Sequence, residues 1–200
     1  MFSLWWTIAG VAMGSDPGLD AYQPVRTAAG CAISMRPETH PEGAAMRAEC
    51  RWPEVDPARL QRVLTQYERY PEFVFPISVA RIERAEAGRT LVYQKQELVG
   101  IADREVLLWM VHSEAAGGAR VAWSAASDQP LELASGAVRT PRNTGYWDVG
   151  PDPDGGARVV HQIAMDAGGY VPKWLVNLVR TTAFAKIMAD VRAFAGGLGR

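Results

Sequence analysis

DAGGYVPKWLVNLVRTTAFAKIMADVRAF, residues 166–194, is the stretch of this 200-residue chain that decides its fold. The pair Gly168-Gly169 breaks the strand-like pattern that precedes it, and Pro172 suits the first turn of a helix. Apolar residues then recur as far as Phe194. The stretch therefore predicts one long helix from about Pro172 to Phe194.

Apolar side chains lie on nearly every side of this expected helix when residues are placed about 100° apart. Charged residues are scattered between them, and they do not gather on one face. Such a helix is contacted on more than one side. One side would pack on a sheet, and the rest would face an internal cavity, a flap or a membrane. A helix buried in an ordinary filled core is the alternative.

Six segments with strand character precede the helix, separated by turns rich in glycine, proline, aspartate and serine. They are residues 77–85, 90–98, 104–114, 119–127, 136–149 and 157–166. Their order predicts an antiparallel meander. No long repeat or low-complexity tract interrupts it, and the length and 48% hydrophobic content suit one domain.

A shorter helix is predicted before the meander. Asp56 and Pro57 supply an N-cap and a first-turn proline, and Leu60, Val63, Leu64 and Tyr67 follow at helical spacing. The helix must end by Tyr70, because Pro71 disfavours helical geometry in the residue before it.

Two short strands, 31–35 and 46–52, form a hairpin with a loop at about residues 37–43. If the hairpin is symmetric about His40 and Pro41, the numbers of paired residues sum to about 81. Cys31 then lies opposite Cys50, close enough for a disulfide. The same geometry would hold two reduced thiols in a cytosolic protein.

Composition and motifs exclude several functions. The net charge of −1, with no block of like charge, argues against a nucleic-acid partner. No zinc-ligand spacing of cysteines and histidines occurs, so we expect no structural metal. Nucleotide-binding glycine motifs are absent, and we expect no cofactor. His40, His112 and His161 sit in unlike contexts without a G-x-S-x-G motif, so no catalytic residue is predicted.

The N-terminal segment Met1–Gly14 is apolar and carries small residues at Ala12 and Gly14, as a signal-peptidase site requires, but no basic residue precedes Arg26. It is too short to span a bilayer. We expect residues 1–18 to be a signal-like or flexible segment, residues 19–196 to be the domain, and the protein to be periplasmic or secreted. An extra N-terminal helix in a cytoplasmic protein is the alternative.

Arg104 and Glu97 stand out as charged residues at the ends of apolar strands, across a short turn. A pair between them inside an apolar cavity would anchor a polar group of a ligand, whereas an exposed ion pair is the alternative. Aromatic residues on three strands and the last helix suit cavity walls. The expected ligand-binding residues are Arg104, Glu97, Tyr93, Trp109, Trp123, Trp147, Trp174 and Leu178.

Four stretches resemble the START family, the lipid-transfer domains related to steroidogenic acute regulatory protein. They are YERYPEFVFP (67–76), ADREVL (102–107), GYWDV (145–149) and DAGGYVPKWLVN (166–177), and the resemblance covers about Leu19 to Phe194. It implies an α+β helix-grip fold, a curved antiparallel sheet wrapped on the C-terminal helix around an apolar cavity. It also implies that Arg104 matches the arginine of the S-x-R-D-F/Y stretch, with Glu105 in place of the aspartate.

The favoured function is a non-enzymatic, monomeric carrier of a lipid, sterol-like or isoprenoid molecule, with transient membrane contact. A polyketide aromatase/cyclase on the same fold is the first alternative, and it would use Arg104, Tyr93 and His112. A structural module whose cavity is filled by side chains is the second.

Overall fold

The computed structural model describes residues 21–37, 44–115, 117–172 and 182–197, and ten strands and three helices lie in these ranges. The strands are β1 (Gln23–Ala28), β2 (Cys31–Arg36), β3 (Ala45–Trp52), β4 (Ile77–Glu86), β5 (Arg89–Gln96), β6 (Arg104–Ala115), β7 (Gly118–Ala125), β8 (Val138–Arg139), β9 (Arg142–Pro151) and β10 (Ala157–Asp166). The helices are α1 (Pro57–Leu64), the 3-10 helix η2 (Tyr67–Glu72) and α3 (Phe184–Ala195).

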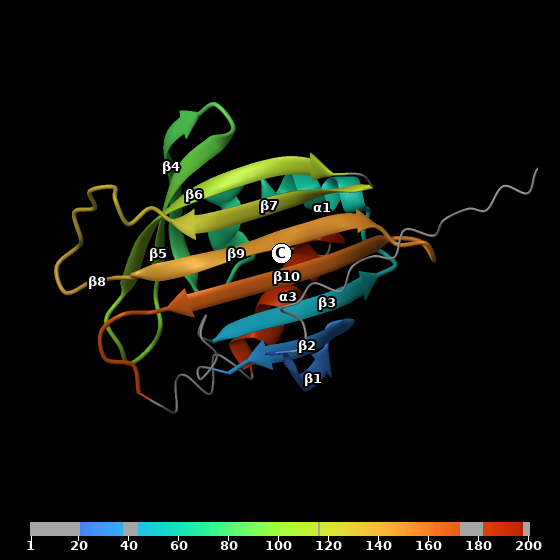
Figure 1. Ribbon diagram of the computed structural model, residues 1–200, viewed down its shortest axis with the longest axis horizontal. Coiled ribbons are helices and arrows are strands. Elements are labelled where there is room, and N and C mark those ends of the chain that lie inside the picture. Colours follow the sequence, from blue (N-terminus) through green and yellow to red (C-terminus); the bar gives the residue numbers. More distant parts are fainter. Residues whose placement is uncertain (1–20, 38–43, 116, 173–181, 198–200) are drawn as a thin grey trace, which may run out of the picture.

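The strands form one curved sheet in the order β1-β2-β3-β10-β9-β7-β6-β5-β4 (Figure 1). Neighbours in this order are antiparallel, and the short β8 runs parallel to β6. The antiparallel meander predicted from the sequence is therefore confirmed. The α+β class and the arrangement of a curved sheet against a C-terminal helix are confirmed as well.

Two strand predictions were wrong in detail. The expected strand 136–149 is divided into β8 and β9, and Pro141 lies at the break. Proline has no amide hydrogen for a sheet ladder and restricts the residue before it. The structure also contains β1, for which no strand was predicted from the sequence. β1 is an exposed edge strand, so it lacks the buried apolar pattern by which strands are recognised.

The helix predicted after Asp56 is confirmed at its start, where the Asp56 side chain accepts a hydrogen bond from the amide of Ala58. It is shorter than expected, because α1 ends at Leu64 and the chain continues as η2. The hydroxyl of Tyr70 donates to the carbonyl of Leu64 at 2.7 Å. This bond satisfies one of the carbonyls that a helix end leaves without a partner.

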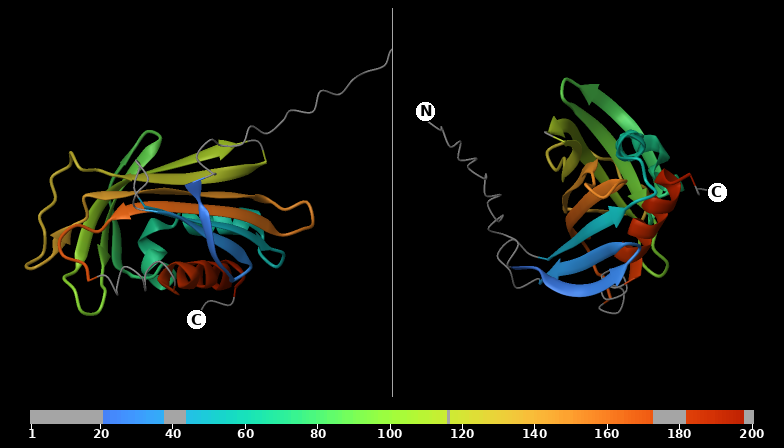
Figure 2. Two further views of the ribbon diagram at one scale, coloured as in Figure 1. Left: turned by 60° about the horizontal axis from the view of Figure 1, so that its bottom comes forward. Right: turned by 90° about the vertical axis from the view of Figure 1, so that its right-hand side faces the viewer.

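Helix α3 lies on the concave side of the sheet (Figure 2). Its buried residues are Phe184, Ala185, Met188, Val191 and Ala195, and they join one core with the inward side chains of the strands. The first part of the expected helix, residues 173–181, lies outside the described residues. No helix within the described ranges is both long and apolar enough to cross a membrane.

Side chains alternate between the two faces of each strand, and β5 shows the consequence. Val92 belongs to the core on the concave face. Leu91 and Tyr93 belong to a second, smaller cluster on the outer face, together with Leu107, Trp109 and Ala126. The concave face therefore carries the main core, and the outer face carries a separate aromatic patch.

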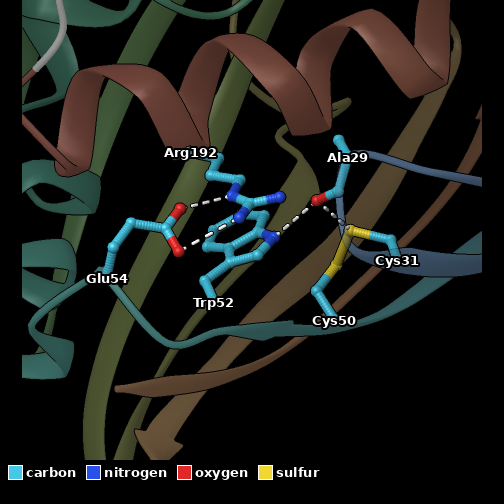
Figure 3. The surroundings of a disulfide bond; sticks show 6 residues. All are labelled: Ala29, Cys31, Cys50, Trp52, Glu54 and Arg192. Atoms are coloured by element: carbon cyan, nitrogen blue, oxygen red, sulfur yellow. Dashed lines mark hydrogen bonds and ion pairs between the residues drawn. A yellow bond between two sulfur atoms is a disulfide. The ribbon is translucent and has the colours of Figure 1, made fainter.

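Cys31 and Cys50 lie opposite each other in the β2–β3 ladder and form a disulfide. The predicted register is confirmed, and of the two states left open by the sequence the structure has the disulfide. Beside the disulfide, the indole nitrogen of Trp52 donates to the carbonyl of Ala29 at 2.8 Å (Figure 3). Arg192 of α3 forms an ion pair with Glu54 at 2.5 Å, so this group of contacts joins the hairpin to the helix.

Removing the disulfide should lower the free energy of unfolding. The two cysteines are 19 residues apart, and a cross-link of that length stabilises a fold by about 3 kcal/mol through loop entropy. We expect the Cys31→Ala/Cys50→Ala double variant to lose about that amount in urea unfolding. A reducing agent should lower the stability of the wild type and leave the double variant unaffected. Equal stability of the two proteins without reducing agent would contradict the prediction.

Candidate ligand-binding site

A pocket of about 580 Å³ lies on the concave side of the sheet, next to the start of α3. This volume falls in the range of small-molecule sites. Most of the described residues that line it are apolar, including Met35, Met46, Val74, Ile77, Leu108, Met110, Ile163 and Ile187. They come from both halves of the sheet, from α3 and from the segments around residues 74–77, 98–101 and 166–171.

Trp123 and Trp147, two of the residues expected to bind the ligand, both line the pocket. They lie on β7 and β9, with their side chains on the concave face. A Cβ atom at Gly145 would lie 2.3 Å from the carbonyl oxygen of Gln162 and 2.5 Å from the Trp123 ring. The glycine of the GYWDV stretch is thus explained by its close approach to the neighbouring strand and to Trp123.

Tyr93 and Trp109 were expected to bind the ligand, but they lie on the outer face of the sheet and do not line the pocket. Arg81 lies 3.8 Å from the Tyr93 ring centre, and Arg89 lies at the same distance from the Trp109 ring. Side chains alternate between the two faces of a strand. Tyr93 and Trp109 point outward because their neighbours Val92 and Leu108 point inward.

Glu97 does not form the expected pair with Arg104. Its carboxylate lies 2.7 Å from the ammonium of Lys95 and is half exposed. The hydrogen bond from Lys95 lowers the pKa of Glu97 below its usual value. Neither the buried nor the exposed form of the Glu97–Arg104 pair is therefore present, and Glu97 pairs with Lys95 instead.

Arg104 is buried, and its guanidinium donates to four backbone carbonyls. The acceptors are Ala102, Ala167 at 3.4 Å, Gly168 at 3.2 Å and Tyr170 at 3.3 Å. A buried charge requires such partners. Burial lowers the pKa of Arg104 from its high normal value, and an arginine stays charged after such a change.

Arg104 therefore joins two segments of the pocket rim. Ile101 on one segment and the residues from Asp166 to Gly169 on the other line the pocket, whereas Arg104 itself does not. Gly168 has a φ of +66°, and a Cβ atom there would lie 2.9 Å from the carbonyl oxygen of Arg139. Only glycine fits this backbone without strain, which accounts for the glycine pair of the 166–177 stretch.

The remaining predicted residues divide into two groups. Trp174 and Leu178 lie outside the described residues. His112, which the aromatase/cyclase alternative would use together with Tyr93 and Arg104, is exposed and does not line the pocket. Of these three polar groups, only Arg104 contacts the segments of the rim.

His161 lines the pocket and was not predicted as a binding residue. Its ring stacks on Trp147 with centres 3.6 Å apart and lies nearly parallel to Phe184 at 5.3 Å. Its Nδ1 atom is 3.1 Å from the carbonyl oxygen of Tyr146. Burial lowers the pKa of His161 to about 3, against a small opposite effect of that hydrogen bond. The imidazole is therefore neutral at physiological pH.

Three further polar side chains of the lining are buried, namely Gln94, Gln96 and Asn143. The amide oxygen of Asn143 accepts a hydrogen bond from the indole nitrogen of Trp123 at 2.8 Å. Neither glutamine side chain forms a hydrogen bond with the part of the chain that the structure describes. Strand alternation could have identified the two glutamines as lining residues, because Gln94 and Gln96 lie on the same face of β5 as the core residue Val92.

The chemical capacity of the described lining is limited. It contains no serine, threonine, cysteine or lysine, and its ionisable side chains are Tyr70, Arg142, His161 and Asp166. Tyr70 is bonded to a backbone carbonyl, and burial raises the pKa of its hydroxyl. Arg142 and Asp166 lie opposite each other in the sheet and are exposed. This arrangement suits the binding of an apolar molecule with a few polar contacts.

Comparison with known proteins supports the same fold. No family model matches the chain. An uncharacterised protein of Pseudomonas aeruginosa is 22% identical over 116 residues, which is 58% of this chain. The match spans only 57% of the length of that relative.

Several solved structures are similar in fold. The STAR-related lipid transfer protein of Xanthomonas axonopodis is 21% identical with a TM-score of 0.76, over 88% of this chain and 99% of that one. Human StAR-related lipid transfer protein 5 is 14% identical with a TM-score of 0.73, over 91% of this chain and 89% of that one. The di-domain ARO/CYC protein BexL of the BE-7585A biosynthetic pathway is 13% identical with a TM-score of 0.50, over 78% of this chain and 50% of that one.

These similarities agree with the resemblance noted in the sequence and with the curved sheet, the pocket and the position of α3. The chain has the helix-grip fold of the STAR-related lipid transfer proteins.

Proposed function

We propose that this protein binds one hydrophobic small molecule, a lipid, sterol-like or isoprenoid compound, and carries it without catalysing a reaction. The observation that carries the proposal is the pocket of about 580 Å³, whose described lining is mostly apolar. Each methylene group removed from water contributes about 0.8 kcal/mol. An aliphatic or polycyclic ligand of ordinary size therefore obtains enough free energy from burial alone.

Exchange of such a ligand requires a local opening of the pocket. The segments joined by Arg104 are our candidates for the moving part. Each carries an exposed apolar side chain, Val99 at 95% and Tyr170 at 84% exposure. These side chains support transient contact with a membrane surface, where aromatic and aliphatic groups partition readily.

An aromatase/cyclase activity is the second candidate, because a di-domain ARO/CYC protein has a related fold. We do not favour it. Tyr93 and His112, two of the three polar groups that it would use, lie away from the pocket. The protein would have to use His161 in their place, and the low pKa of that ring makes it a poor base near neutral pH.

We also propose that the protein works as a monomer in an oxidising compartment, the periplasm or the outside of the cell. The disulfide between Cys31 and Cys50 supports this assignment, because disulfides rarely persist in a reducing cytosol. The expected export role of Met1–Gly14 agrees with it. Thiol alkylation of the protein from its natural host, without reduction, should label neither cysteine. Labelled Cys31 or Cys50 would place the protein in a reducing compartment.

Ligand binding can be tested on the purified protein. We expect extraction with organic solvent, followed by mass spectrometry, to release an apolar molecule in a ratio approaching one per chain. The apolar fluorescent probe N-phenyl-1-naphthylamine should bind after extraction, with enhanced fluorescence. A protein that yields no molecule and does not bind this probe would contradict the proposal.

Filling the pocket should abolish probe binding. Ile187 lies on α3 and lines the pocket, whereas Ala189 on the same helix is exposed. We expect Ile187→Trp to weaken binding of the naphthylamine probe at least tenfold by occupying its space. The matched variant Ala189→Trp should bind as the wild type does. Equal affinities of the two variants, with unchanged thermal unfolding, would place the bound probe elsewhere.

Loss of Arg104 should loosen the rim of the pocket. Arg104→Leu leaves four carbonyls without their donor, and we expect it to destabilise the fold by about 2–4 kcal/mol. Amide hydrogen exchange should rise in residues 97–103 and 167–172. Arg104→Lys should restore little of the lost stability or of the protection from exchange, because one ammonium group cannot reproduce the planar fork of guanidinium donors. The control Arg81→Leu removes an exposed arginine and should leave exchange in both segments unchanged.

A further inference from the structure

His161 is a polar group within an aromatic part of the pocket. Its register partners in the sheet are Trp147 on β9 and Ala48 on β3. Trp147 and Phe184 cover the faces of the imidazole, and the Trp123 ring centre lies 5.7 Å away. One edge of the ring, at Nδ1, points to the carbonyl of Tyr146. The edge that remains for the pocket is the one that carries Nε2.

The hydrogen bond to Tyr146 decides the state of this edge. A carbonyl oxygen only accepts, so Nδ1 carries the hydrogen of the neutral ring. Nε2 then has a lone pair and no hydrogen. It forms no hydrogen bond with any residue that the structure describes. His161 is 3% exposed as a residue and lines the pocket, so a donor for Nε2 has to come from the pocket.

We propose that Nε2 of His161 accepts a hydrogen bond from a hydroxyl group of the bound molecule, so that the pocket selects neutral, hydroxyl-bearing apolar ligands. This inference rests on the proposed function and adds the chemical class of the ligand. An ether of the same size has no hydrogen to donate and leaves Nε2 unpaired. An ionised carboxylate has only acceptor atoms and also loses its hydration in an apolar site.

The surroundings of His161 agree with a neutral ligand group. The residues that β3, β9 and α3 present to the ring are Ala48, Trp147 and Phe184, and none of them carries a charge. Arg104 is engaged with backbone carbonyls and does not line the pocket. The exposed Arg142 and Asp166 carry opposite charges at register-paired positions. The three residues around the ring therefore provide no charge that would favour an anion over an alcohol next to Nε2.

The experiment compares three probes with twelve carbon atoms each, 1-dodecanol, 1-methoxyundecane and dodecanoic acid. Their affinities are measured at pH 7.5 by displacement of N-phenyl-1-naphthylamine, whose own affinity is determined for every variant. We expect the wild type to bind the alcohol about 3- to 10-fold more tightly than the ether, because one neutral hydrogen bond raises the affinity by about this factor. The acid should bind at least tenfold more weakly than the alcohol.

His161→Phe keeps an aromatic ring between Trp147 and Phe184 and removes the acceptor. We expect it to bind the alcohol and the ether equally, with the affinity for the ether close to that of the wild type. The matched control Ile163→Val changes an apolar lining residue on the same face of β10. This control should weaken binding of the alcohol and of the ether by the same factor, so the ratio of the two affinities should stay unchanged.

Two results would overturn the inference while leaving the proposed function intact. One is equal binding of alcohol and ether by the wild type, and the other is a preference for the alcohol that persists in His161→Phe. Failure of the naphthylamine probe and of all three ligands to bind the wild type would overturn the proposed function itself.

A pH series checks that the variant is folded and that His161 is neutral in the wild type. The pKa of His161 is about 3 when folded and about 6.5 when unfolded. Between these values the unfolded chain binds more protons, so this residue destabilises the fold as pH falls below 6.5. The urea midpoint of the wild type should therefore fall more steeply from pH 7 to pH 4.5 than that of His161→Phe. Parallel curves would contradict a buried neutral imidazole.

Discussion

The alternation of side chains along the strands of one curved sheet is the constraint on which the site depends. Every second residue of the central strands points to the concave face, where α3 and the strands share one core. Trp123, Trp147 and His161 are on that face and line the pocket. Tyr93 and Trp109 are on the other face and pack against arginines. The same physical rule thus separates pocket walls from the aromatic patch outside.

A second constraint comes from the buried charge of Arg104. A guanidinium removed from water needs several acceptors, and here backbone carbonyls supply them. Two of the family-like stretches, 102–107 and 166–177, meet through these bonds. The left-handed backbone of Gly168 brings its carbonyl within reach of the arginine. Arg104 therefore positions the rim of the pocket, and its role as a direct ligand contact is not needed to explain its burial.

The pocket combines a largely apolar wall with a few neutral polar groups. Such a wall binds by burial and distinguishes ligands weakly by length, because each methylene changes affinity only modestly. Selectivity must then come from the polar positions. His161 is suited to this task, since stacking holds its ring and the carbonyl of Tyr146 sets its tautomer. The same burial that makes it a good acceptor makes it a poor acid or base near neutral pH.

Local patterns in the sequence determined the meander, the start of α1 at Asp56 and the pairing of Cys31 with Cys50, because these depend on neighbouring residues and on hairpin register. Only the tertiary structure decided which face of each strand became concave. The tertiary structure also determined that Glu97 forms its ion pair with Lys95 and that β1 is the edge strand of the sheet. It placed the ring of His161 between Trp147 and Phe184. These outcomes depend on contacts between residues far apart in the chain and on the curvature of the whole sheet, which no local pattern encodes.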